Sequence, residues 1–61
     1  MKLVIKVTMD NAAFDDYPAG EASRILQEFS RTIRDHAFEP GDSYKLMDYN
    51  GNTVGEARVT R

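Results

Sequence analysis

The sequence predicts an α+β protein with the order strand, helix, strand, strand, in which one helix packs on one face of a three-stranded antiparallel sheet. Apolar residues alternate with polar residues near the start, follow a helical period in the middle, and alternate again near the end. A turn segment, residues 48–52, divides the last third into two strands. With 61 residues and no linker or repeat, we expect one domain, residues 1–61.

The first strand is predicted over residues 2–9. Its apolar members Leu3, Ile5, Val7 and Met9 share one face, while Lys2, Val4, Lys6 and Thr8 share the other. This period of two indicates a strand with one buried face. The following residues, 10–17, are polar apart from Phe14, which we expect to anchor an ordered loop against the core.

A helix is predicted from Pro18 to Ala37. Proline suits the first helical turn, where its missing amide proton has no partner in any case, and nearby carboxylates favour the positive end of the dipole. These carboxylates are Asp15, Asp16 and Glu21. One arc of the helix is apolar and should be buried: Ala22, Ile25, Leu26, Phe29 and Ile33. The opposite arc should face water: Arg24, Glu28, Arg31 and Asp35.

The last third is predicted to be a hairpin of residues 44–47 and 53–60. Gly51 accepts the positive φ that the turn needs, and the Asp48 side chain can accept hydrogen bonds from turn amides. A two-residue turn would pair Met47 with Val54, whereas a type I turn with a glycine bulge would pair Leu46 with Val54. We prefer the second register because aspartate suits its first position. A bulge near Gly55 would reconcile the two.

The composition excludes several classes of protein. There is no cysteine, which removes disulfides, zinc thiolates and thiol nucleophiles. The net charge of −2 predicts neither a strong attraction to nucleic acid nor the dense carboxylate surface of a DNA mimic. The apolar run near Met1 is too short for a signal peptide or membrane span. We therefore expect a soluble, cytoplasmic protein with no membrane partner.

No catalytic or metal-binding constellation is recognisable. His36 is the single histidine and is expected to be half-buried or to cap the helix end. The acidic residues around the helix start lack the glycine and the closing glutamate of a calcium loop. The serines have neither a nearby base nor a glycine elbow. We predict no enzyme activity, no catalytic or metal-binding residue and no cofactor.

Binding residues are the remaining candidates. A single helix covers one face of the sheet, so the other face is open to solvent or to a partner. Tyr49 stands at the turn tip, where a large ring is poorly buried, and exposed tyrosine is a common interface anchor. The candidate partner-binding residues are Tyr49, Met47, Arg24, Arg31 and Arg34.

Three stretches carry a resemblance over most of the chain: residues 10–14 (DNAAF), 21–26 (EASRIL) and 46–55 (LMDYNGNTVG). The chain resembles small, uncharacterised accessory proteins of bacteriophages and prophages. This resemblance implies a phage accessory origin and a location in the bacterial host cytoplasm. It implies no activity and no site residues, because the shared motifs are residues that set the fold.

Three hypotheses follow from that origin. The first is a non-enzymatic protein that binds and blocks a bacterial protein, for example a host-defence complex such as a CRISPR effector. The second is a nucleic-acid-associated phage factor that uses Arg24, Arg31, Arg34 and Lys45. The third is a homodimeric structural module of a larger phage assembly. We rank them in that order.

Overall fold

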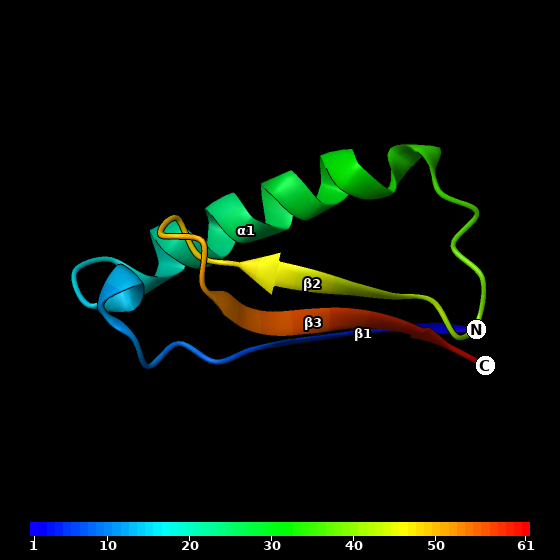
Figure 1. The fold of residues 1–61 in the computed structure, drawn as a ribbon, viewed down its shortest axis with the longest axis horizontal. Helices are drawn as coiled ribbons and strands as arrows, with labels where there is room; N and C mark the ends of the chain where they lie inside the picture. Colours follow the sequence, from blue (N-terminus) through cyan, green and yellow to red (C-terminus); the bar gives the residue numbers. More distant parts are fainter.

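A computed structural model describes residues 1–61 and shows a three-stranded sheet with one α-helix beside it (Figure 1). Its main elements are β1 (Lys2–Val7), α1 (Pro18–Thr32), β2 (Ser43–Met47) and β3 (Thr53–Thr60). Short 3-10 turns cover Ala12–Phe14 and Ile33–Asp35. The predicted α+β class and the element order are confirmed.

The C-terminal strand β3 lies in the middle of the sheet, in the order β1-β3-β2. Both neighbours run antiparallel to it, as predicted. Residues 2–7 of β1 pair with residues 60–55 of β3 without interruption. Consequently β1 and β2 are both edge strands, and only β3 has a hydrogen-bonded neighbour on each side.

The β2–β3 hairpin contains both registers that the sequence allowed. Met47 pairs with Thr53, as the type I turn with a glycine bulge requires, whereas Leu46 pairs with Gly55 in the alternative register. The preferred partner of Leu46, Val54, is therefore wrong, because Val54 is the extra residue of a β-bulge. The bulge changes the alternation of side chains, so that Val54 and Ala57 are both buried.

The helix ends earlier than the sequence predicted. It begins at Pro18 as expected but gives way to a 3-10 turn after Thr32, and His36 is already extended, with φ −100° and ψ 149°. The reversal that follows holds Phe38 at a positive φ of 59° and stacks its ring 6.0 Å from that of Tyr44. The chain must turn at this point to bring Phe38 back over β2, so a helix to Ala37 does not fit.

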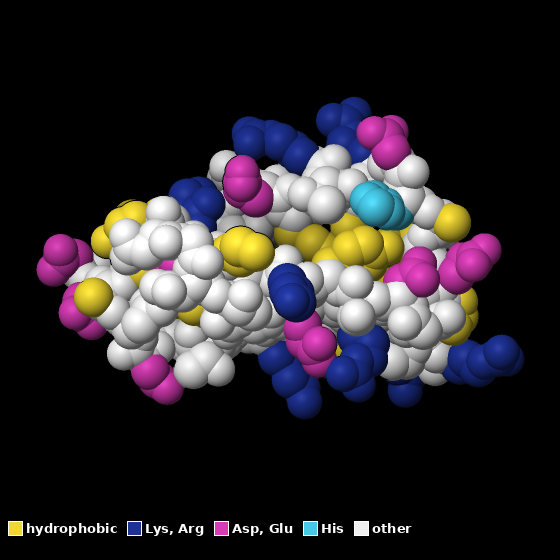
Figure 2. Space-filling view, viewed as in Figure 1, with side chains coloured by type: hydrophobic (Ala, Val, Ile, Leu, Met, Phe, Trp, Pro, Cys, Tyr) yellow, Lys and Arg dark blue, Asp and Glu magenta, His cyan; other side chains and the backbone are white.

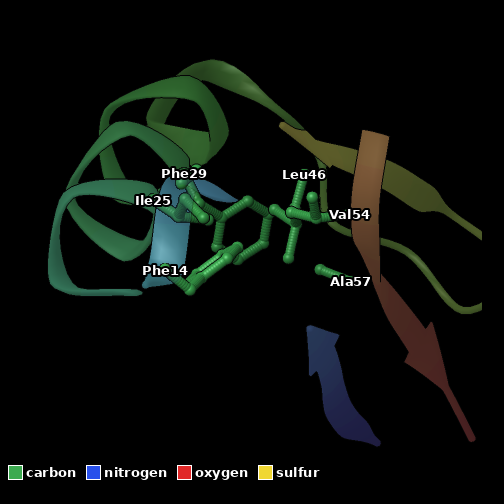
Figure 3. Packing of buried hydrophobic residues seen from close by; sticks show 7 residues of the cluster. Phe14, Ile25, Phe29, Leu46, Val54 and Ala57 are labelled. Carbon is green, nitrogen blue, oxygen red and sulfur yellow. The ribbon is translucent and has the colours of Figure 1, made fainter. Parts of the chain in front are cut away.

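The core lies between α1 and the sheet (Figure 3). Its buried members come from the loop, the helix and both hairpin strands: Ala13, Phe14, Ile25, Phe29, Leu46, Val54 and Ala57. The expectation that Phe14 anchors the loop is confirmed, since its side chain is buried. Leu26, in contrast, is 45% exposed, which contradicts its predicted place in the buried arc.

The edge strand β1 is less covered than its alternating pattern predicts. Leu3 and Ile5 are 43% and 37% exposed, although their partners Val59 and Ala57 on β3 are buried. The helix packs against β2 and against the 3-10 turn Ala12–Phe14. Because the helix packs against β2 and not chiefly against β1, the face of β1 that the sequence predicted as buried is only partly covered.

Gly55 allows the β1 and β3 backbones to approach closely, and we expect its replacement to be severe. A Cβ at this position would overlap the carbonyl oxygen of Lys6 and lie 2.9 Å from Cα of Val7. Backbone atoms cannot rotate away, so Gly55→Ala should lower the free energy of unfolding by about 3 kcal/mol, the upper range for overpacking. Urea denaturation measures this loss.

Gly51→Ala is the matched control. Gly51 has a φ of +86°, but nothing lies within 4 Å of an added Cβ. Its replacement should cost only the backbone strain of about 1–2 kcal/mol. An equal or smaller loss for Gly55→Ala would contradict a steric role for Gly55.

Candidate functional site

Two carboxylates are buried where the turn of the β2–β3 hairpin meets the start of α1. Asp48 and Glu21 are only 4% and 7% exposed. The sequence predicted that Asp48 would organise the turn and that Glu21 would lie near the positive end of the helix dipole. Glu21 does lie in the first turn of α1. Its side chain is in addition buried beneath the hairpin turn and bonded to it, which the sequence did not predict.

Asp48 holds the turn together through both oxygens of its side chain. Oδ1 accepts hydrogen bonds from the backbone amides of Asn50 (2.9 Å) and Asn52 (2.8 Å). Oδ2 accepts from the side-chain amides of Asn11 (2.7 Å) and Asn52 (3.2 Å). The Gly51 amide also donates to the Asp48 carbonyl at 3.0 Å. One aspartate therefore orders the turn and ties it to the loop after β1.

Glu21 joins this turn to the helix. Its Oε2 accepts a 2.8 Å hydrogen bond from the backbone amide of Tyr49, and its carboxylate forms a two-point contact with Arg24 (2.8 and 3.1 Å). Arg24 also donates to the Met47 carbonyl at 3.1 Å. We call Asn11, Glu21, Arg24, Asp48 and Asn52 the polar network. It connects three segments that are far apart in the sequence.

The polar network keeps both carboxyl groups ionised at neutral pH. The hydrogen bond from Arg24 lowers the pKa of Glu21, and it outweighs the opposing effect of burial. Burial is the largest influence on Asp48 and would raise its pKa, but the bonds from Asn52, Asn11 and Asn50 together lower it. The same ion pair raises the pKa of Arg24. Every buried side-chain nitrogen or oxygen has a hydrogen-bond partner.

A groove runs beside the polar network, between α1 and the edge strand β2. Its volume is about 460 Å³, and Ile25, Phe29 and Leu46 contribute apolar side chains to its lining. Figure 2 looks toward this side of the molecule and shows hydrophobic atoms between the helix and the sheet. Tyr49 and Met47 also line the groove and are 62% and 49% exposed. We call this feature the Tyr49 groove.

The structure brings together three of the five candidate binding residues. Tyr49, Met47 and Arg24 line the Tyr49 groove, but the guanidinium of Arg24 is already engaged by Glu21 and Met47. Arg31 and Arg34 are exposed and do not line it. Sequence reasoning missed Glu21, although its spacing of three residues from Arg24 on a helix was a usable signal for an ion pair.

The arrangement offers shape and polarity for binding. The chain contains no group of three or more histidine, cysteine, aspartate or glutamate side chains placed to hold a metal ion. None of its helices combines the length and the hydropathy needed to cross a bilayer.

Comparison with known proteins finds no matching family model, no similar curated protein and no similar solved structure.

Replacing Asp48 tests the importance of the polar network for stability. In Asp48→Asn, an amide group would face the donors of Asn11 and Asn52, so at least one part-buried donor would lose its acceptor. We expect a lower midpoint of thermal unfolding, measured by circular dichroism. Glu56→Gln, which changes the same charge in an exposed ion pair, should have a much smaller effect. Equal midpoints for the two variants would contradict this role.

The lowered pKa values predict how stability depends on pH. The folded protein binds protons on Glu21 and Asp48 less readily than the unfolded chain, whose carboxyl groups titrate near pH 4. Their contribution to stability is therefore complete above about pH 5. It should be lost progressively as the pH falls through 4 toward the lower folded pKa values. Urea denaturation at several pH values should show this loss, and Asp48→Asn should weaken the dependence.

Proposed function

We propose that this chain is a non-enzymatic accessory protein that binds a bacterial protein through the Tyr49 groove. The observation that carries the proposal is an exposed tyrosine on a backbone that the protein holds rigidly. The Tyr49 side chain is 62% exposed, while its amide is fixed by the buried Glu21 at 2.8 Å. Exposed aromatic anchors of this kind supply a large part of the binding energy in protein interfaces.

The rigidity of the turn supports a binding role. A loop that is ordered before association loses little conformational entropy when a partner arrives. Asp48 and Glu21 fix the turn from beneath, which leaves the ring of Tyr49 and the thioether of Met47 outside. Methionine adapts its shape to irregular partners, so the two residues combine a rigid anchor with an adaptable contact.

The edge strand β2 adds a second kind of contact. Its outer side has no neighbouring strand, and the Tyr49 groove lies directly beside it. A partner segment in an extended conformation can pair with such an edge and place its side chains in the groove. Arg24, which bonds the carbonyl of Met47, limits this pairing at one end of the strand.

The class of partner follows from the resemblance to phage and prophage accessory proteins. Such a protein acts in the bacterial host cytoplasm, where blocking a host-defence component, for example a CRISPR effector, requires only a rigid binding surface. We propose steric inhibition of this type, without a catalytic step or cofactor. A second copy of the chain could occupy the same exposed surfaces. The alternative to a bacterial partner is therefore a homodimer, which would form in a concentration-dependent way.

Tyr49→Ala should abolish partner binding without unfolding the protein. The substitution keeps the backbone amide that Glu21 binds and removes only an exposed ring. For an aromatic anchor we expect an affinity loss of about 30-fold or more, which corresponds to about 2 kcal/mol. Affinity capture from nuclease-treated bacterial lysate, followed by mass spectrometry, identifies the partner, and titration with the purified partner measures the loss.

Tyr17→Ala is the matched control, because Tyr17 is an equally large ring with 71% exposure that does not line the groove. A partner that is retained by Tyr17→Ala and lost with Tyr49→Ala supports the proposal. A partner retained by both variants, or no host protein bound at micromolar concentration, overturns it.

A further inference from the structure

The outer face of the sheet, opposite α1, carries half of the lysine and arginine side chains of the molecule, with a single carboxylate among them. Side chains alternate along each strand, and Leu46, Ala57 and Val59 point toward the helix side. Glu56 and Arg58, which alternate with Ala57 and Val59 on β3, therefore point away from the helix, and so do their partners on β1 and β2. The charged residues of this outer face are Lys2, Lys6, Lys45, Glu56 and Arg58. We call it the basic sheet face.

The charge distribution is strongly asymmetric. The basic sheet face holds all three lysines and one arginine against a single carboxylate, which gives it a formal charge of +3. The other four arginines and nine carboxylates leave −5 on the rest of the molecule, so that the total is −2. Figure 2 shows dark blue side chains along the lower margin of the molecule, below the sheet, with little magenta among them. The low net charge therefore conceals a cationic surface.

The carboxylates on the rest of the molecule do not cancel the attraction of the basic sheet face for a bound polyanion. The two shorter dimensions of the molecule are 19 and 17 Å, whereas the screening length in about 0.1 M salt is roughly 10 Å. A polyanion lying on the sheet is screened from carboxylates on the opposite side. Those carboxylates also repel it from the helix side, so the charge asymmetry orients its approach.

We propose that the basic sheet face binds duplex DNA through its phosphate backbone, without reading sequence. Lys6 and Lys45 lie on either side of Glu56, two strand spacings apart, which is roughly 10 Å between their backbones. Lys2 and Lys6 are four residues apart, roughly 13 Å along β1. Phosphate rows across the DNA major groove have a similar separation of about 12 Å. The sheet thus presents cations at the spacing of the phosphate rows of a duplex.

Other polyanions fit this face less well. Single strands are normally held by aromatic rings on which bases stack, and no aromatic residue points out from this face. A membrane surface favours exposed aromatic and large apolar groups beside the cations, whereas Val4, Ser43 and Thr60 are the neutral neighbours here. An acidic protein segment would supply fewer negative charges per unit length than DNA does.

Fluorescence anisotropy with a labelled, random-sequence DNA duplex tests the proposal. Glu56 neutralises one of the four cations, with a 2.7 Å contact to Arg58, so about three phosphates should be engaged. The logarithm of the association constant should then fall with the logarithm of salt concentration with a slope of about −3. Lys6→Ala combined with Lys45→Ala should reduce the slope to about −1. A slope near zero overturns the proposal.

Arg31→Ala combined with Arg34→Ala is the matched control, because it removes two exposed cations from the helix side. This variant should keep the slope and affinity of the unaltered protein, and an equal loss would overturn the assignment to the sheet. Tighter binding to a single strand of the same sequence, to polyglutamate or to anionic lipid vesicles would also overturn it. Tyr49→Ala should bind DNA normally, which separates this inference from the proposed protein-binding function.

Discussion

The structure depends on two buried carboxylates, and each of their oxygens accepts at least one hydrogen bond. An ionised group removed from water without partners would destabilise so small a domain severely. Here Asp48 accepts four hydrogen bonds and Glu21 accepts three, and no buried polar side-chain atom is left without a partner. Only eight apolar residues are buried in the whole chain. The polar network therefore adds a second set of contacts between the loop, the helix and the hairpin, which the small core also joins.

This constraint separates the molecule into a part that is fixed and parts that are free to bind. The turn is immobilised from below, yet Tyr49 and Met47 remain at the surface beside the edge strand β2. The outer face of the sheet lies on another side and carries mainly cations, with Val4 as its one exposed apolar residue of large size. A protein that presents two chemically different surfaces can contact two kinds of partner at once, and steric blocking would then combine with attachment to nucleic acid.

Part of the fold could be predicted from the sequence because it depends only on the preferences of neighbouring residues. The predicted bounds of the last strand, residues 53–60, are those of β3, and the aspartate and glycine of residues 48–52 located the turn. Pro18 marked the first residue of α1. The predicted burial of Leu26 and the predicted helix end at Ala37 failed because helical periodicity does not state how far a sheet extends beneath the helix. Phe38 leaves the helical path to pack on Tyr44, a contact with a distant strand.

The sequence by itself determined the fold class, the order of the elements and the turn, because propensity, periodicity and turn chemistry are local properties of the chain. It also indicated Tyr49 as an exposed residue, since a turn tip has no core to enter. Only the tertiary structure decided that Glu21 is buried beneath Tyr49, that the bulge expected near Gly55 falls at Val54, and that all three lysines share one face. Each of these depends on strand register and on contacts between distant segments, which no local pattern encodes.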